Sequence, residues 1–196
     1  FEGVQWRVIE VSDDPIAELN QTVEVERGKI GELMVAGPMV TRQYVVRSDQ
    51  NAMHKVADGT RIWHRMGDLG YLDQQDRFWF CGRKAHRVTT SERTLYTIPC
   101  EAIFNAHPKV YRSALIGLGP NGQQTPLILI ELHPEFAGDH QVDHAQLTQE
   151  LLELAARNPL TRRIERVVIR DEPLPVDIRH NSKIFRERLA EEYTDR

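Results

Sequence analysis

The hydrophobic pattern of the chain changes once, between residues 84 and 88, and this change constrains the fold more than any other feature. Before it, short strand-like runs are separated by turn signals such as Asp13-Asp14-Pro15 and Asp58-Gly59. After it, strand-like and helix-like segments alternate. This order predicts an α+β fold, with a small antiparallel β-barrel-like subdomain at 1–83 and a compact α+β domain at 89–196.

The periodicity predicts the elements of each part. In the first part we expect strands at Val4–Val11, Gly31–Ala36, Arg61–Arg65, Gly70–Leu72 and Phe78–Cys81, with Trp63, Phe78, Trp79 and Phe80 in the core. In the second part we expect a roughly three-stranded sheet with flanking helices: strands at Val110–Leu118, Leu127–Leu132 and Ile164–Ile169, and helices at Pro99–Ala106, Asp143–Arg157 and Lys183–Tyr193. The almost wholly apolar run Leu127–Leu132 is typical of a central strand.

Composition excludes several classes of protein. The 196 residues are 40% hydrophobic and carry a net charge of −4, which gives no long-range attraction for nucleic acid or an anionic membrane. The longest apolar run, Pro126–Leu132, is far too short to span a bilayer. Cys81 and Cys100 lack C-x-x-C spacing, so neither a disulfide framework nor a zinc site is indicated, and we expect a cytoplasmic location.

One polar stretch has spacing that could suit a metal ion. Asp139, His140, Asp143 and His144 include a pair of residues four apart. A polar loop followed by a helix that Asp143 caps, with Gln146 three residues on, explains the stretch at least as well. We therefore predict no metal site in this chain.

Four short motifs follow one another at a regular order and spacing. They are Gly31-Glu32-Leu33 with Gly37-Pro38 and Tyr44, then His64–Tyr71, then Phe80–Lys84, and finally Ser182-Lys183 followed by Ile184, Arg186 and Leu189. Together they resemble consecutive motifs of the AMP-forming superfamily of acyl- and aryl-CoA synthetases, peptide-synthetase adenylation domains and luciferases. The resemblance runs from the last subdomain of the large N-terminal region through the small C-terminal domain.

The resemblance implies a role for three residues. Asp68 would accept hydrogen bonds from both ribose hydroxyls of ATP, although Met66 stands where the family usually has threonine. Arg83 would reach the same ribose with its fork of donors. Lys183 would bridge the substrate carboxylate and the α-phosphate. The alternatives are an aspartate that closes a turn, a surface arginine at a strand end and the first charged residue of an exposed helix.

The segment after Arg83 departs from the family pattern. The resemblance places a hinge at 84–88, around Lys84, Ala85 and His86, but the family's two acidic residues are replaced by Ala85 and His86. Glu92 stands where the family has a glycine beside the pantetheine channel used in thioester formation. A long charged side chain there would obstruct close approach of a ligand. The alternative is a one-residue misalignment across a variable loop.

Within the superfamily, residues 82–88 and 179–186 most resemble the olefin β-lactone synthetases of bacterial long-chain hydrocarbon biosynthesis. This implies that ATP adenylates a long-chain β-hydroxy fatty acid, whose own hydroxyl then closes the ring without CoA. It also implies Mg²⁺, with its ligand outside this chain, and other enzymes of the same lipid pathway as partners. A long-chain fatty acyl-CoA ligase with a degenerate hinge is one alternative. A catalytically inactive structural or interaction module is another, and we expect the isolated chain to be inactive.

Overall fold

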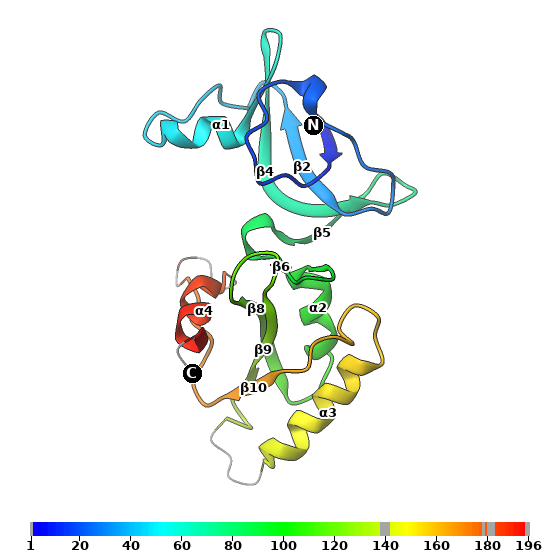
Figure 1. Ribbon diagram of the computed structural model, residues 1–196, viewed down its shortest axis with the longest axis vertical. Helices are drawn as coiled ribbons and strands as arrows, with labels where there is room; N and C mark the ends of the chain where they lie inside the picture. Colours follow the sequence, from blue (N-terminus) through cyan, green and yellow to red (C-terminus); the bar gives the residue numbers. More distant parts are fainter. Residues whose placement is uncertain (1, 138–141, 178, 180–182, 195–196) are drawn as a thin grey trace. The chain divides into compact units, whose positions relative to one another are not determined.

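The computed structural model describes residues 2–137, 142–177, 179 and 183–194 (Figure 1). The chain divides into two compact units, 1–85 (unit 1) and 86–196 (unit 2). This division lies inside the segment 84–88, whose action as a hinge stays a prediction. The α+β class expected from the sequence is confirmed, since unit 1 is built on an antiparallel sheet and unit 2 on a mixed sheet with helices.

Unit 1 is organised around one long strand. Its strands are β1 (Gln5–Ile9), β2 (Gly31–Ala36), β3 (Lys55–Asp58), β4 (Arg61–Leu72) and β5 (Phe78–Arg83), and short helical turns lie at Leu19–Gln21, Ser48–Gln50 and Asn51–His54. The order is β1-β2-β4-β3, with β5 paired to β4, and every pairing is antiparallel. Over the described residues these strands form an open sheet, and not the barrel-like arrangement expected from the sequence.

Strand β4 joins two strands that the sequence predicts as separate. The glycines at 67 and 70 suggest a turn, and the structure shows instead a strand with a register shift between Leu69 and Gly70. Gly67 adopts a φ of 68°, and a Cβ at Gly70 would lie 2.3 Å from the Trp79 carbonyl oxygen. These glycines therefore let β4 bend and approach β5 closely without ending.

The core of unit 1 contains Ile9, Met34, Ala36, Val56 and Trp63. The expectation for Trp63 holds, because its side chain is buried. The expectation that Trp79 and Phe80 are core residues was wrong, since they are 50% and 45% exposed. The Trp79 ring stacks on Tyr71 of β4 at 6.4 Å, and its indole nitrogen donates to Oδ2 of Asp73 in the turn that follows β4.

Unit 2 is a three-stranded sheet between helices. Its strands are β8 (Val110–Leu118), β9 (Thr125–Leu132) and β10 (Val167–Arg170), in the order β10-β9-β8, with β8 antiparallel and β10 parallel to β9. A hairpin of β6 (Val88–Thr89) and β7 (Thr94–Leu95) precedes them, and a 3₁₀ turn spans Lys84–His86. The helices are α2 (Thr97–Phe104), α3 (His144–Ala156) and α4 (Arg186–Thr194).

The apolar run in β9 serves two cores. Ile128 and Ile130 face one cluster, with side chains from α2 and α3, while Leu127 and Leu129 face another, with side chains from α4. Figure 1 shows α2 and α3 on one side of the sheet and α4 on the other. A strand buried on both faces needs apolar residues at every position, so the central place expected for this run is confirmed.

Two helix starts differ from the prediction, and backbone pairing explains that of α4. Asp143 caps α3 as expected, with its Oδ1 accepting from the amides of Ala145 and Gln146 at 2.9 and 3.0 Å. Helix α4 begins at Arg186 and not at Lys183, because residues 183–185 pair with 175–177. Helix α2 begins two residues before Pro99, at Thr97. Among the residues described, no helix has the length and apolar character needed to cross a membrane.

Candidate functional site

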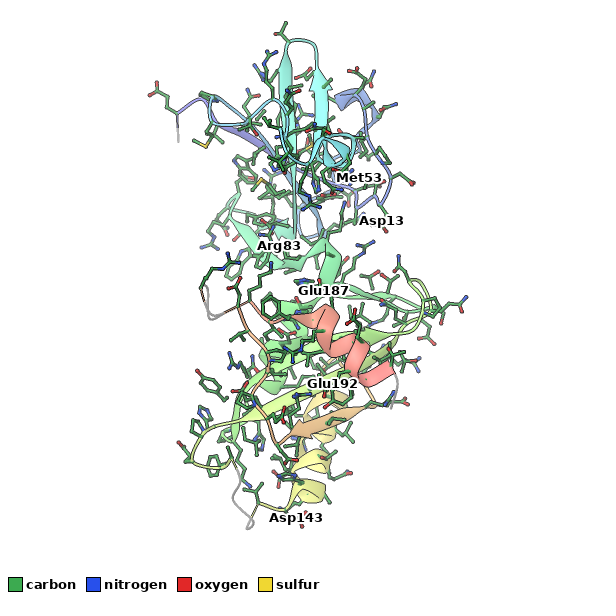
Figure 2. The ribbon with its side chains drawn as sticks, turned by 90° about the vertical axis from the view of Figure 1, so that its left-hand side faces the viewer. Asp13, Met53, Arg83, Asp143, Glu187 and Glu192 are labelled. Atoms are coloured by element: carbon green, nitrogen blue, oxygen red, sulfur yellow. The ribbon has the colours of Figure 1, made fainter. Side chains whose placement is uncertain are left out.

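Asp68 and Arg83 lie directly opposite each other on neighbouring strands. Asp68 of β4 and Arg83 of β5 are register partners, and the Arg83 Nη1 lies 2.9 Å from the Asp68 Oδ1. The same Nη1 donates to the carbonyl oxygen of Met66 at 3.1 Å. Figure 2 shows Arg83 where β5 ends. The structure thus brings together two of the three residues singled out from the sequence.

The carboxylate of Asp68 has acceptor capacity beyond its contact with Arg83. Burial raises the pKa of Asp68, while Arg83 opposes this rise and the more distant Glu32 adds to it. Arg83 bonds to one carboxylate oxygen, and an ionised carboxylate offers about four acceptor positions. Two hydroxyl groups could therefore be accepted by Asp68 while its contact with Arg83 persists.

A buried ionic group lies in the same sheet, and the sequence did not reveal it. Arg65 and Glu32 have fully buried side chains, and Arg65 donates Nε and Nη2 to the Glu32 Oε2 at 3.1 and 2.7 Å. Its remaining N–H groups reach three carbonyl oxygens, those of Ser12, Asp14 and Met53. All five donors of the guanidinium are satisfied, so the group fastens the loop at 12–14 and α1 (Asn51–His54) to the sheet.

The predicted hinge residues are bonded within different units. In unit 1, Lys84 Nζ donates to the Ser12 carbonyl at 3.0 Å and to the Glu32 Oε2 at 3.2 Å. In unit 2, His86 Nε2 lies 3.2 Å from the Glu187 Oε1, which Figure 2 shows in the first turn of α4. Burial lowers the pKa of His86, and Glu187 opposes that change. Ala85 stands between these two bonded side chains.

Lys183 lies in unit 2, on a segment that is held by backbone pairing. Its carbonyl oxygen accepts from the Asp177 amide at 2.9 Å, and the Phe185 amide donates to the Pro175 carbonyl at 2.9 Å. The next residue, Ile184, is buried in the core against α4. The side chain of Lys183 is exposed. Its predicted neighbours Asn181 and Ser182 lie outside the described residues.

Comparison with known proteins indicates the family to which the chain belongs. No family model matches the chain. It is 43% identical over 189 residues to an olefin β-lactone synthetase of Xanthomonas campestris pv. campestris, which covers 94% of this chain and 33% of that protein. An olefin β-lactone synthetase of Stenotrophomonas maltophilia is 42% identical over the same extent. The ATP-bound RpMatB-BxBclM chimera B1 superposes on 98% of this chain and 35% of its own, with a TM-score of 0.75 and 26% identity.

The chain belongs to the AMP-forming acyl-CoA synthetase superfamily. It corresponds to the C-terminal part of the proteins in that superfamily. It spans about a third of the length of the two olefin β-lactone synthetases named above. The resemblance identified from the motifs is thereby confirmed. Sequence similarity to a 2-succinylbenzoate–CoA ligase of Bacillus cytotoxicus is lower and shorter, at 31% identity over 44% of this chain, whereas the solved anthranilate CoA ligase AuaEII superposes on 97% of it with a TM-score of 0.74 and 19% identity.

Glu92, where the sequence resemblance expects a glycine, lies in the turn between β6 and β7. Its amide donates to the Thr90 Oγ1 at 3.2 Å, and its exposed carboxylate lies 3.6 Å from Arg163. Among the described residues other than glycine, a positive φ occurs at Asp76, so the backbone of Glu92 does not itself require glycine. The side chain points toward solvent and not into the core of unit 2.

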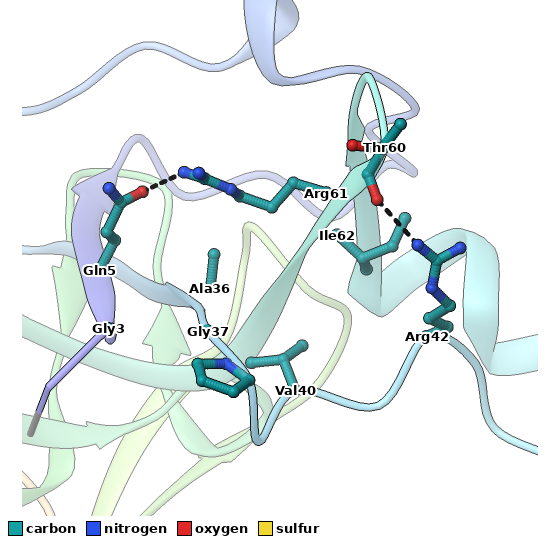
Figure 3. Close-up of a pocket in the computed structure, with 10 residues that line it drawn as sticks. Gly3, Gln5, Ala36, Gly37, Val40, Arg42, Thr60, Arg61 and Ile62 are labelled. Carbon is teal, nitrogen blue, oxygen red and sulfur yellow. Dashed lines mark hydrogen bonds between the residues drawn. The ribbon is translucent and has the colours of Figure 1, made fainter.

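Other candidates do not join the site. Asp143 is occupied as the cap of α3, and Asp139 and His140 lie outside the described residues. Unit 1 also has a cavity of about 510 Å³ between Gly37 and Thr60, which holds none of the predicted site residues. Figure 3 shows its two arginines, Arg42 and Arg61, bonded to the Thr60 carbonyl and to Gln5.

Proposed function

We propose that the full-length protein containing this chain adenylates a long-chain β-hydroxy fatty acid with ATP and closes it to a β-lactone without CoA. The observation that carries the proposal is the 42–43% identity to proteins named olefin β-lactone synthetase, which extends over both units. Similarity to the CoA ligase from Bacillus cytotoxicus covers less than half of the chain.

In this proposal Asp68 and Arg83 bind the ribose of ATP. Their opposition across β4 and β5 supports the role, because it presents a carboxylate acceptor and a guanidinium donor side by side. A ribose diol can donate both hydroxyl protons to the carboxylate, and the guanidinium can donate to a ribose oxygen. The two residues would orient the nucleotide, so that the α-phosphate meets the substrate carboxylate.

Lys183 would stabilise charge during adenylation. A carboxylate oxygen of the fatty acid forms a bond to the α-phosphorus, and the bond to pyrophosphate breaks. Negative charge on the α-phosphate oxygens grows in this step, and an ammonium group beside them lowers the barrier without moving a proton. The exposed Lys183 side chain on a backbone-paired segment is consistent with this role.

Ring closure would use the nucleophile that the substrate already carries. The β-hydroxyl oxygen bonds to the acyl carbon, its proton is lost, and the bond to AMP breaks. Because the nucleophile is tethered, no second substrate has to enter through a channel. Glu92 in place of glycine, and Ala85 and His86 in place of the hinge acids, agree with a protein that does not form thioesters.

Two of the similar solved structures contain bound ATP, which supports the use of ATP in this proposal. The requirement for a magnesium ion is a further part of the proposal. Within the described part of the chain there is no group of three or more metal-ligating side chains. It is the family resemblance that places the magnesium ligands outside this chain. A cytoplasmic location and partners from the same lipid pathway also belong to the proposal.

The test is to incubate full-length protein with ATP and a β-hydroxy fatty acid, with CoA omitted. We expect stoichiometric AMP and β-lactone. Release of AMP only when CoA is added, with a thioester of a simple fatty acid as the product, would instead support the acyl-CoA ligase. The isolated 196-residue chain should give no ATP–pyrophosphate exchange; exchange by that chain would contradict the division of the site.

A further inference from the structure

A buried ion pair lies at the start of α4, next to the segment that carries Lys183. Arg186 donates Nη1 to the Glu101 Oε1 at 2.6 Å and Nη2 to the Glu101 Oε2 at 3.1 Å. Both side chains are almost fully buried, at 11% and 8% exposure. This two-pronged contact fixes the position and the orientation of the guanidinium.

The pair is also bonded to the central sheet. The Leu115 amide of β8 donates to the Glu101 Oε1 at 2.7 Å, and Arg186 Nη1 donates to the Leu115 carbonyl at 3.2 Å. Glu101 comes from α2 and Arg186 from α4, and these helices cover opposite faces of the sheet. One residue of β8 thus connects both helices through charged hydrogen bonds.

Arg186 follows Lys183 by three residues, and the segment between them has little freedom. Ile184 is buried against α4, and the Arg186 amide donates to the Ile184 carbonyl at 3.1 Å. On the other side, Lys183 and Phe185 pair with residues 175–177. The position of the Lys183 backbone therefore depends on the position of Arg186.

We propose that Arg186, held by Glu101, is the positioning residue for Lys183 in adenylate formation. The inference rests on the proposed function, because it assigns Lys183 to that step. Loss of the pair would shift the ammonium group away from the α-phosphate while the ribose contacts of unit 1 stay intact. A misplaced transition-state contact lowers kcat and leaves substrate binding nearly unchanged.

Arg170 provides a matched control at the other end of α4. It is equally buried, at 8% exposure, and donates to Glu192 and to the Tyr193 hydroxyl at 3.0 Å each. Figure 2 shows Glu192 well along α4 from Glu187. Arg170→Met thus weakens the docking of the same helix far from Lys183, which separates a positioning role from a structural one.

The experiment measures adenylation by full-length protein, as pyrophosphate release with a β-hydroxy fatty acid, for the variants R186M, R186K, E101Q and R170M. For R186M we expect kcat to fall about 100-fold with the KM for ATP changed less than about 3-fold. We expect the kcat of E101Q and of R186K to fall about 10-fold, since each variant keeps part of the contact between residues 101 and 186. The kcat of R170M should stay within about 2-fold of the wild-type value, even if its melting temperature falls as much as that of R186M.

The outcomes separate the two proposals. Equal losses in R186M and R170M, in step with their stability, would overturn the positioning role. If R186M does not fold, E101Q and R186K decide the matter: kcat at the wild-type level in both overturns it, and a selective loss of kcat supports it. K183A tests the proposed function itself, and adenylation unchanged in K183A would overturn the role of Lys183 along with the inference. A loss in K183A with wild-type kcat in R186M would overturn the inference alone.

Discussion

Each unit has a buried carboxylate–arginine pair near a candidate site residue in the sequence, and the two pairs are built differently. In unit 1 the buried Arg65 lies three residues before Asp68 and pairs with Glu32. In unit 2 the buried Arg186 lies three residues after Lys183 and pairs with Glu101. In each unit, therefore, the arginine of a buried carboxylate–arginine pair lies three residues along the chain from the residue that would contact the substrate.

The pairs differ in what they connect. In unit 1, the hydrogen bonds that Glu32 receives from Arg65 and Lys84 all go to its Oε2, and its Oε1 has no hydrogen-bond partner among the described residues. In unit 2, both oxygens of Glu101 are bonded by Arg186. The first pair ties α1 and the segment 12–14 to the sheet through backbone carbonyls, while the second ties α2 and α4 to β8. We expect the first to matter for folding and the second for the placement of Lys183.

The largest effect is expected from Arg65→Met. This change leaves the carboxylate of Glu32 buried with only Lys84 beside it, and three carbonyl oxygens lose a donor. Removing one partner of a buried ion pair costs about 3–5 kcal/mol. We expect the urea transition of unit 1 to move to much lower concentration while that of unit 2 stays in place. The measurement is urea denaturation of the 196-residue chain followed by circular dichroism.

The two cysteines report which unit has opened. Cys81 lies in unit 1 and Cys100 in unit 2, and both are buried. Burial raises the pKa of Cys81, and raises that of Cys100 to about 11, so both react slowly with a thiol reagent at pH 8 in the folded chain. In R65M, Cys81 should react first. Arg77→Met is the control, since this arginine is exposed; equal reactivity of Cys81 in the two variants would count against the prediction.

A smaller effect is expected from Glu101→Gln. The glutamine keeps the shape and can still accept from Arg186, but the guanidinium loses its counter-charge. A hydrogen bond to a charged group contributes about 1.5–3 kcal/mol, so we expect unit 2 to lose about 2 kcal/mol. Urea denaturation should show the shift in unit 2 alone, with Cys100 as the reactive thiol. Glu153→Gln, on the exposed face of α3, is the matched control.

The sequence predicted the parts of the fold that local pattern encodes. Gly31–Ala36 and Val110–Leu118 were predicted with their observed bounds, and the cap at Asp143 was foreseen. Strand β4 and the start of α4 were not, because long-range hydrogen bonds decide both. Gly67 and Gly70 suggest a turn unless β5 is known to lie beside them.

The candidate site shows the same limit. The roles of Asp68, Arg83 and Lys183 came from the resemblance and remain proposals, while the contact between Asp68 and Arg83 appears only once β4 and β5 are paired. The burial of Arg65 and Arg186 was not recognised from the sequence, because a charged residue is usually exposed. One signal was present: Arg65 lies two residues after the core residue Trp63, on the same face of the strand, so it needed a buried partner.

Acid should weaken both units through one histidine in each. Burial is the main cause that lowers the pKa of His64 in unit 1 and of His86 in unit 2, below the ordinary value of 6.5. The unfolded chain then binds a proton more tightly than the folded chain, so the stability these groups contribute is complete above pH 6.5 and is lost as the pH falls below it. His64→Gln and His86→Gln should each flatten the pH dependence of one unit, measured as urea midpoints between pH 7 and 5. An unchanged slope in both variants would show that other groups cause the acid sensitivity.

The smallest effect is expected from His86→Asp, which introduces an acidic residue of the kind that the sequence resemblance expects there. The new carboxylate would face Glu187, which lies 3.2 Å from the histidine and is 68% exposed. His86 is 13% exposed, but solvent around Glu187 screens the repulsion between the two carboxylates, so we expect that repulsion to cost unit 2 less than about 1 kcal/mol. The double variant His86→Asp with Glu187→Lys should recover that loss, because it replaces repulsion with attraction at the same place. A urea midpoint that the second change does not move would mean that His86 acts in unit 2 by packing and not through Glu187.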